Sequence, residues 1–186
     1  MNRTFKTTLV VALLAGGLTF SLSAAPSSGE VDFGKFALVG KDTKFVEVNV
    51  KGTLISLAAK LVEEDEPDVA KLLRSVKLVR VNVIGLDEKN GGDMEKRTQD
   101  IRTQLDKGGW ERIVAAQEQG SGDVGVYVKM RGEEAIEGLV VIAVDGNKKE
   151  AVFVNIVGDI RPDQVAAVGK ALDFDPLKKA GESLKR

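Results

Sequence analysis

Hydrophobic and polar residues alternate over two short stretches in the first half of the chain. From Phe45 to Val50 the valines are separated by Glu47 and Asn49, and a similar alternation runs from Val76 to Leu86. A period of two residues is typical of a strand that buries one of its faces. We therefore predict strands over 45–50 and 76–86.

Four more strands are predicted in succession in the second half of the chain. Valine and isoleucine are concentrated in these stretches, and glycine-, aspartate- and asparagine-containing segments separate them. Such residues favour tight turns, so neighbouring strands should pair as an antiparallel meander. The four predicted strands are Trp110–Gln117, Val124–Arg131, Ile136–Val144 and Ala151–Gly158.

Apolar residues spaced three or four positions apart predict helices between the first strands. Thr53 is suited to cap the first helix, and Pro67 is suited to begin a second helical segment, because proline is tolerated in the first turn. The first helix is expected to turn one apolar row inward, made of Leu54, Leu57, Leu61 and Val62.

Two further helices are predicted from their boundaries. One should begin at Asp93 and end at Gly108-Gly109; its inward row is so thin that it should lie on the surface of the domain. That row consists of Met94, Ile101 and Leu105. A last helix should begin at Pro162.

This order of elements predicts an α+β domain with a single, mostly antiparallel sheet and helices packed on one face. The expected order is strand, helix, strand, helix, four strands and a helix. Period-two alternation assigns twelve apolar residues to the face beneath the helices: Val46, Val48, Val50, Val79, Val81, Val83, Val124, Val126, Val128, Val152, Val154 and Ile156.

The N-terminus has the features of a cleavable secretory signal. Arg3 and Lys6 precede an uncharged, apolar stretch over 7–22, and small residues follow it. We expect cleavage between Ala25 and Pro26, no membrane span afterwards, and a periplasmic or secreted protein. The expected parts are a signal peptide (1–25), a weakly ordered segment (26–43), one α/β sandwich domain (44–172) and a charged tail (173–186).

Composition excludes several classes of function. The chain has no histidine and no cysteine, so Ser-His-Asp and Cys-His nucleophiles, zinc sites built on these residues and lipoprotein attachment are all excluded. The formal net charge is −1 with mixed signs, whereas nucleic-acid binding needs a concentrated basic surface. We expect no cofactor, no metal and no catalytic residue.

Four motifs have a functional and a structural interpretation. Gly120, Gly122 and Gly125 match a dinucleotide fingerprint, but they join two predicted strands and favour a hairpin. The acidic run over 63–68 could bind calcium, yet it suits the start of a helix at Pro67. Ser56 and Lys60 lie one helical turn apart, as a Ser-Lys nucleophile requires, but such pairs are also common on helices. Trp110 and Tyr127 could form a platform for a ligand or pack between the layers of the domain.

The succession of strands and turns resembles a family of bacterial secreted proteins, the domain of unknown function 4252. The resemblance rests on VKLVRVNVIG, VGVYVKMRG, LVVIAVDG and VFVNIVGDI, and it covers about 44–172. It implies the fold and the compartment. The pattern contains no reactive residues, so it implies no activity.

Our first hypothesis is a non-catalytic module of the bacterial envelope that binds another envelope protein or a second copy of itself. Its expected surface is the sheet face opposite the valines, made of Arg80, Asn82, Tyr127, Lys129, Arg131 and Asn155 around Leu139, Val141, Phe153 and Val157. The competing interpretation is that the segment 31–39 or a helix covers this face. The alternative function is a histidine-free hydrolase that uses carboxylates or the Ser56-Lys60 pair.

Overall fold

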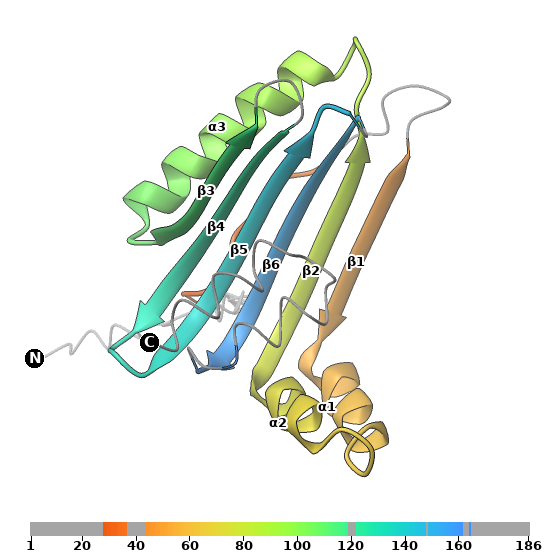
Figure 1. Ribbon diagram of the computed structural model, residues 1–186, viewed down its shortest axis with the longest axis vertical. Helices are drawn as coiled ribbons and strands as arrows, with labels where there is room; N and C mark the ends of the chain where they lie inside the picture. The colour runs from red at the N-terminus through yellow and green to blue at the C-terminus, as the bar shows by residue number, and fades with distance from the viewer. Residues whose placement is uncertain (1–27, 37–43, 119–121, 148, 162–163, 165–186) are drawn as a thin grey trace, which may run out of the picture.

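Six strands form one antiparallel sheet in the computed structural model (Figure 1), which describes residues 28–36, 44–118, 122–147, 149–161 and 164. The order across the sheet is β1-β2-β6-β5-β4-β3. The predicted meander is confirmed, because β3 to β6 are neighbours in sequence order, and β1 and β2 extend the sheet beyond β6. The strands are β1 (Phe45–Lys51), β2 (Val76–Gly85), β3 (Glu111–Glu118), β4 (Gly122–Arg131), β5 (Ala135–Asp145) and β6 (Glu150–Ile160).

Three helices lie among the described residues: α1 (Gly52–Leu61), α2 (Pro67–Ser75) and α3 (Gly91–Lys107). Pro67 begins α2 as predicted. None of these helices combines the length and the apolar character that crossing a membrane requires. The last predicted helix and the C-terminal tail lie outside the described residues, as does the expected signal peptide.

Two predicted helix starts are wrong. α1 begins at Gly52, so Thr53 lies inside the helix and caps nothing. α3 begins at Gly91, which places Asp93 in its first turn. The earlier start of α3 follows from the preceding turn, where the backbone amide of Asn90 donates to Asp87 at 2.9 Å and the Asn90 side chain donates to the Gly85 carbonyl at 2.9 Å.

The twelve apolar residues assigned to one face do share it, which we call the valine face. Strand register aligns them in rows, for example Val48 beside Val81, and Val81 beside Val154. Leu139 and Val141 belong to the same face, because they pair with Ile156 and Val154. Their assignment to the opposite face was wrong: β5 is apolar on both sides between Leu139 and Val144, and its polar Glu137 lies at a β-bulge, where alternation is interrupted.

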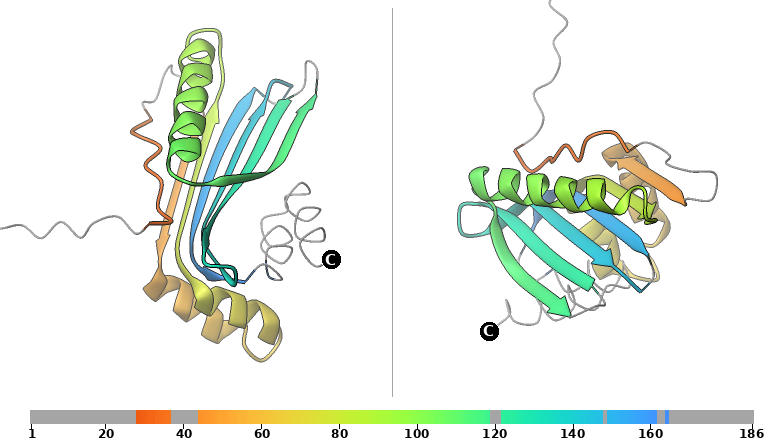
Figure 2. Two further views of the ribbon diagram at one scale, coloured as in Figure 1. Left: turned by 90° about the vertical axis from the view of Figure 1, so that its left-hand side faces the viewer. Right: turned by 90° about the horizontal axis from the view of Figure 1, so that it is seen from above.

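The helices divide between the two faces (Figure 2). α1 and α2 lie at one end of the sheet, where Ile55 of α1 and Leu72 of α2 join the hydrophobic cluster on the valine face. α3 lies on the opposite face, which we call the α3 face, where its buried Ile101 and Leu105 join a cluster with Tyr127 and other residues of the strands. The expectation that α3 covers the valines is therefore wrong. β5 and β6 carry apolar side chains on both sides, so both faces need a cover.

Residues 28–36, which we call the strap, cross the α3 face in an extended conformation (Figure 2). Val31 and Phe33 are buried, at 2% and 3% exposure. The backbone of the strap lies very close to the backbone of β5. A Cβ atom at Gly138 would lie 2.8 Å from the Gly29 Cα and 2.4 Å from the Trp110 ring, so a side chain has no room there. Glycine at position 138 is thus a condition for seating the strap.

Candidate functional site

The centre of the predicted recognition face is covered. Tyr127, Phe153 and Asn155 are at most 1% exposed. They lie beneath α3 and the strap, where the Phe33 and Phe153 rings are 5.6 Å apart. The structure thus agrees with the competing interpretation, in which the segment beginning at Val31 covers the face, for the described part of that segment.

The remaining residues of the predicted face fall into two separate groups. Arg80 and Asn82 lie on β2, whereas Lys129 and Arg131 lie on β4, with β6 and β5 between the two strands. Arg131 is exposed and donates to Asp159 at 2.5 Å. The hydrogen bond and the charge of Asp159 raise the pKa of Arg131, so this side chain remains a paired surface cation.

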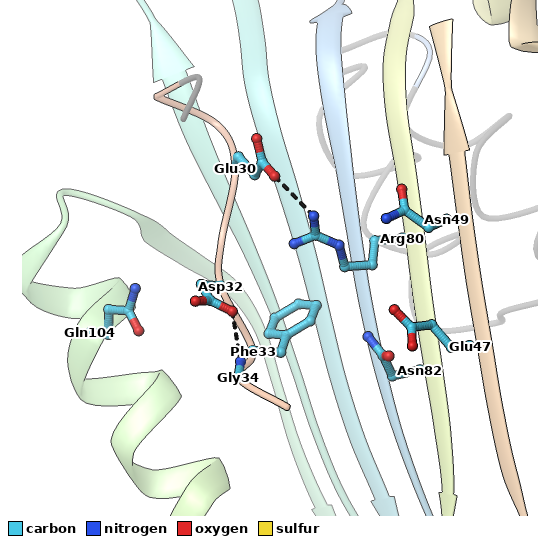
Figure 3. Close-up of a pocket in the computed structure, with 9 residues that line it drawn as sticks. All are labelled: Glu30, Asp32, Phe33, Gly34, Glu47, Asn49, Arg80, Asn82 and Gln104. Atoms are coloured by element: carbon cyan, nitrogen blue, oxygen red, sulfur yellow. Dashed lines mark hydrogen bonds and ion pairs between the residues drawn. The ribbon is translucent and has the colours of Figure 1, made fainter. Parts of the chain in front are cut away.

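A polar groove remains open where Arg80 and Asn82 lie (Figure 3). It has a cavity volume of about 470 Å³ and separates the strap from the edge of the sheet. Four segments contribute its walls: the strap, β1, β2 and α3. The lining residues are Glu30, Asp32, Phe33, Gly34, Glu47, Asn49, Arg80, Asn82 and Gln104.

Arg80 holds the strap side of the groove in place. Its guanidinium donates to the Glu30 carboxylate at 2.9 Å and to the Val31 carbonyl at 3.1 Å. The opposite wall comes from Glu47 and Asn49, whose side chains share one face of β1 because residues two apart on a strand point the same way. The groove therefore combines three carboxylates with one guanidinium that already has a carboxylate partner.

A second surface feature is a row of exposed leucines on α1. Leu54, Leu57 and Leu61 are 61%, 55% and 76% exposed, and we call them the leucine row. The prediction that they point inward is wrong, because α1 instead buries Ile55 and Ala59. α1 has apolar residues on two adjacent faces, and periodicity alone selects either of them.

The other motifs have structural roles or no assembled chemistry. Trp110 and Tyr127 are buried between α3 and the sheet. β3 and β4 pair as the expected hairpin, in which a Cβ atom at Gly125 would lie 2.8 Å from the Tyr127 ring. Ser56 and Lys60 are exposed on α1 and line neither the groove nor the cavity beside Phe36. The acidic run carries an ion pair from Glu63 to Arg74.

Sequence reasoning missed the strap's contribution to the groove. The strap reaches the α3 face through hydrogen bonds that span more than a hundred residues, so no local pattern announces them. The leucine row was visible in the sequence, but it was predicted to point inward. Apart from Gly52, the ten residues of α1 include only three polar ones, Thr53, Ser56 and Lys60, so the sequence does not mark which face is exposed.

Comparison with known proteins gives one match. A family model described as "Domain of unknown function (DUF4252)" matches residues 36–168. No curated protein matches the chain significantly, and no solved structure does so either.

Proposed function

Since the chain belongs to the family defined by the domain of unknown function DUF4252, we propose a role from its own surfaces: a non-catalytic envelope module that binds another protein through α1. The leucine row is the observation that carries this proposal. Its three leucines are spaced at i, i+3 and i+7, so they form one continuous face of the helix.

Burial of this row would supply the energy for association. Fully burying one leucine side chain contributes about 1.5–3 kcal/mol. Val46 and Val48, on the edge strand that leads into α1, are also exposed, at 39% and 38%. Isolated exposed hydrophobic residues are ordinary, whereas a row on one helix face is typical of a protein contact.

The envelope location is supported by the N-terminal residues. Arg3 and Lys6, the uncharged stretch after them and the small residues before Pro26 suit export and cleavage. Intact-mass measurement of the exported protein should therefore give a chain that starts at Pro26. A membrane-retained chain that still contains residues 1–25 would contradict this location.

Charging the leucine row should abolish partner binding and leave the fold intact. We expect Leu54→Lys with Leu61→Lys to keep the thermal unfolding midpoint, because lysine and leucine have similar helix propensities and both sites are exposed. A tagged mature chain, purified from native envelopes under mild crosslinking, should lose its protein partner in this variant.

The matched control adds the same charge elsewhere. Gln99→Lys with Thr103→Lys places two lysines on exposed positions of α3 and should retain the partner. Retention of the partner by the leucine-row variant would contradict the proposal. Binding of the purified wild-type chain to phosphatidylethanolamine and phosphatidylglycerol vesicles, lost on charging the row, would replace the protein partner with a lipid surface.

A further inference from the structure

Two asparagines on the α3 face have very different surroundings. Asn155 is fully buried, and its side chain takes part in three hydrogen bonds: it accepts from the Val31 amide at 3.0 Å and donates to the Gly29 and Leu139 carbonyls at 3.0 and 3.2 Å. Asn82 is also buried, at 3% exposure. Its side chain has no hydrogen-bond partner among the described residues, although it lines the groove.

The Asn82 side chain is largely enclosed, yet its amide bonds to no group of the described residues and opens onto the groove. Most asparagines buried to this degree have a hydrogen-bond partner in the protein or in ordered solvent. Figure 3 shows Asn82 on the floor of the groove, next to Glu47. The amide is therefore placed to bond with a ligand that enters the groove.

The charges around Asn82 define what that ligand carries. Asp32 accepts one hydrogen bond, from the Gly34 amide at 2.8 Å, and neither Asp32 nor Glu47 has an ion pair in the described part of the chain. Arg80, the one cation of the lining, is paired with Glu30 at 2.9 Å. The lining residues thus leave two negative charges without a counterion.

The small number of carboxylates in the groove favours an organic cation over a metal ion. Within the described residues, no three acidic side chains are close enough to hold a metal. Ammonium and guanidinium groups present several N–H donors in different directions, so they can bond to acceptors that lie apart. The Asn82 carbonyl oxygen supplies a further acceptor beside Glu47, which pairs with Asn82 across β1 and β2.

We propose that the groove binds a ligand that carries an ammonium or guanidinium group, with Glu47 and Asp32 as counterions and Asn82 as the orienting acceptor. This site lies on the α3 face and does not rest on the leucine row. The same chemistry occurs in free amines and in basic side chains of peptides. The experiment below separates these two sources.

The test is an NMR titration of the mature chain with three probes. Acetyl-Gly-Arg-Gly-amide should give saturable shifts of the Asn82 side-chain amide and the Gly34 backbone amide, whereas the citrulline peptide of the same shape should not. Equal binding of agmatine would assign the site to free amines, and preference for the arginine peptide would assign it to basic side chains. Equal binding of the arginine and citrulline peptides, or the absence of saturable shifts with both cationic probes, would overturn the proposal.

Two variants connect the binding to these residues. Glu47→Gln with Asp32→Asn should weaken binding about tenfold or more, while Glu95→Gln with Asp106→Asn, two exposed positions of α3, should not change it. Asn82→Leu should abolish binding and leave the thermal unfolding midpoint close to that of the wild type, because no hydrogen bond from the Asn82 side chain to the described residues would be lost. A fall in that midpoint as large as the fall caused by Asn155→Leu would show that Asn82 is structural, and would overturn its role.

Discussion

Replacing Tyr127 with alanine should lower the free energy of unfolding by about 3–5 kcal/mol, the usual cost of deleting a large buried aromatic side chain. Tyr127 is 1% exposed and packs in the cluster formed by α3 and the strap. Chemical denaturation monitored by circular dichroism measures the change. The effect would show that this face of the sheet is core.

The neighbouring strand positions provide the comparison. Val128→Asp should also unfold the domain, because Val128 is 3% exposed on the valine face and an unpaired charge would be buried there. Arg131→Ala should change stability little, since its exposed ion pair with Asp159 is screened by solvent. If Tyr127→Ala were as mild as Arg131→Ala, the α3 face would be open and a recognition surface would again be possible there.

Replacing Asn155 with leucine should release the strap from the sheet. The change leaves the Val31 amide and the Gly29 carbonyl without partners, at a cost of about 1–3 kcal/mol for each buried group. Hydrogen exchange should therefore become faster at Val31, and the thermal unfolding midpoint should fall.

The same measurement has a clear contrary outcome. Unchanged protection at Val31 in Asn155→Leu would mean that Arg80, Arg97 and the phenylalanine contacts hold the strap without Asn155. Arg97 donates to the Lys35 carbonyl at 2.8 Å and lies 4.7 Å from the centre of the Phe36 ring. In that case the groove wall would not depend on Asn155.

The strands could be predicted because valine recurs at every second position, and side chains at every second position of a strand lie on the same face of the sheet. Each of the six predicted strands exists, with ends shifted by only a few residues. The side of the sheet that each helix covers was not predictable, because β5 and β6 are largely apolar in both phases. Asn155 of β6 marks one phase as polar, yet Phe153 in the same phase shares a buried cluster with residues of α3.

The candidate sites were less accessible to sequence reasoning. Arg80 and Asn82 stood out as polar residues within a strand, and both line the groove. Glu30, which pairs with Arg80, and Asp32, which also lines the groove, lie about 50 positions earlier in a segment with no periodic pattern. Two faces of α1 are apolar, one that contains Ile55 and one that contains Leu57. The sequence favours neither face, and only the packed structure shows that the face with Leu57 is exposed.

The central claim is that the leucine row contacts another protein. Site-specific photo-crosslinking from position 57 in intact cells tests it most directly, with position 99 on α3 as the control. We predict a single discrete adduct from position 57, lost when Leu54 and Leu61 are replaced by lysine, and no such adduct from position 99. The absence of a protein adduct from position 57, or an adduct that persists in the lysine variant, would contradict the claim.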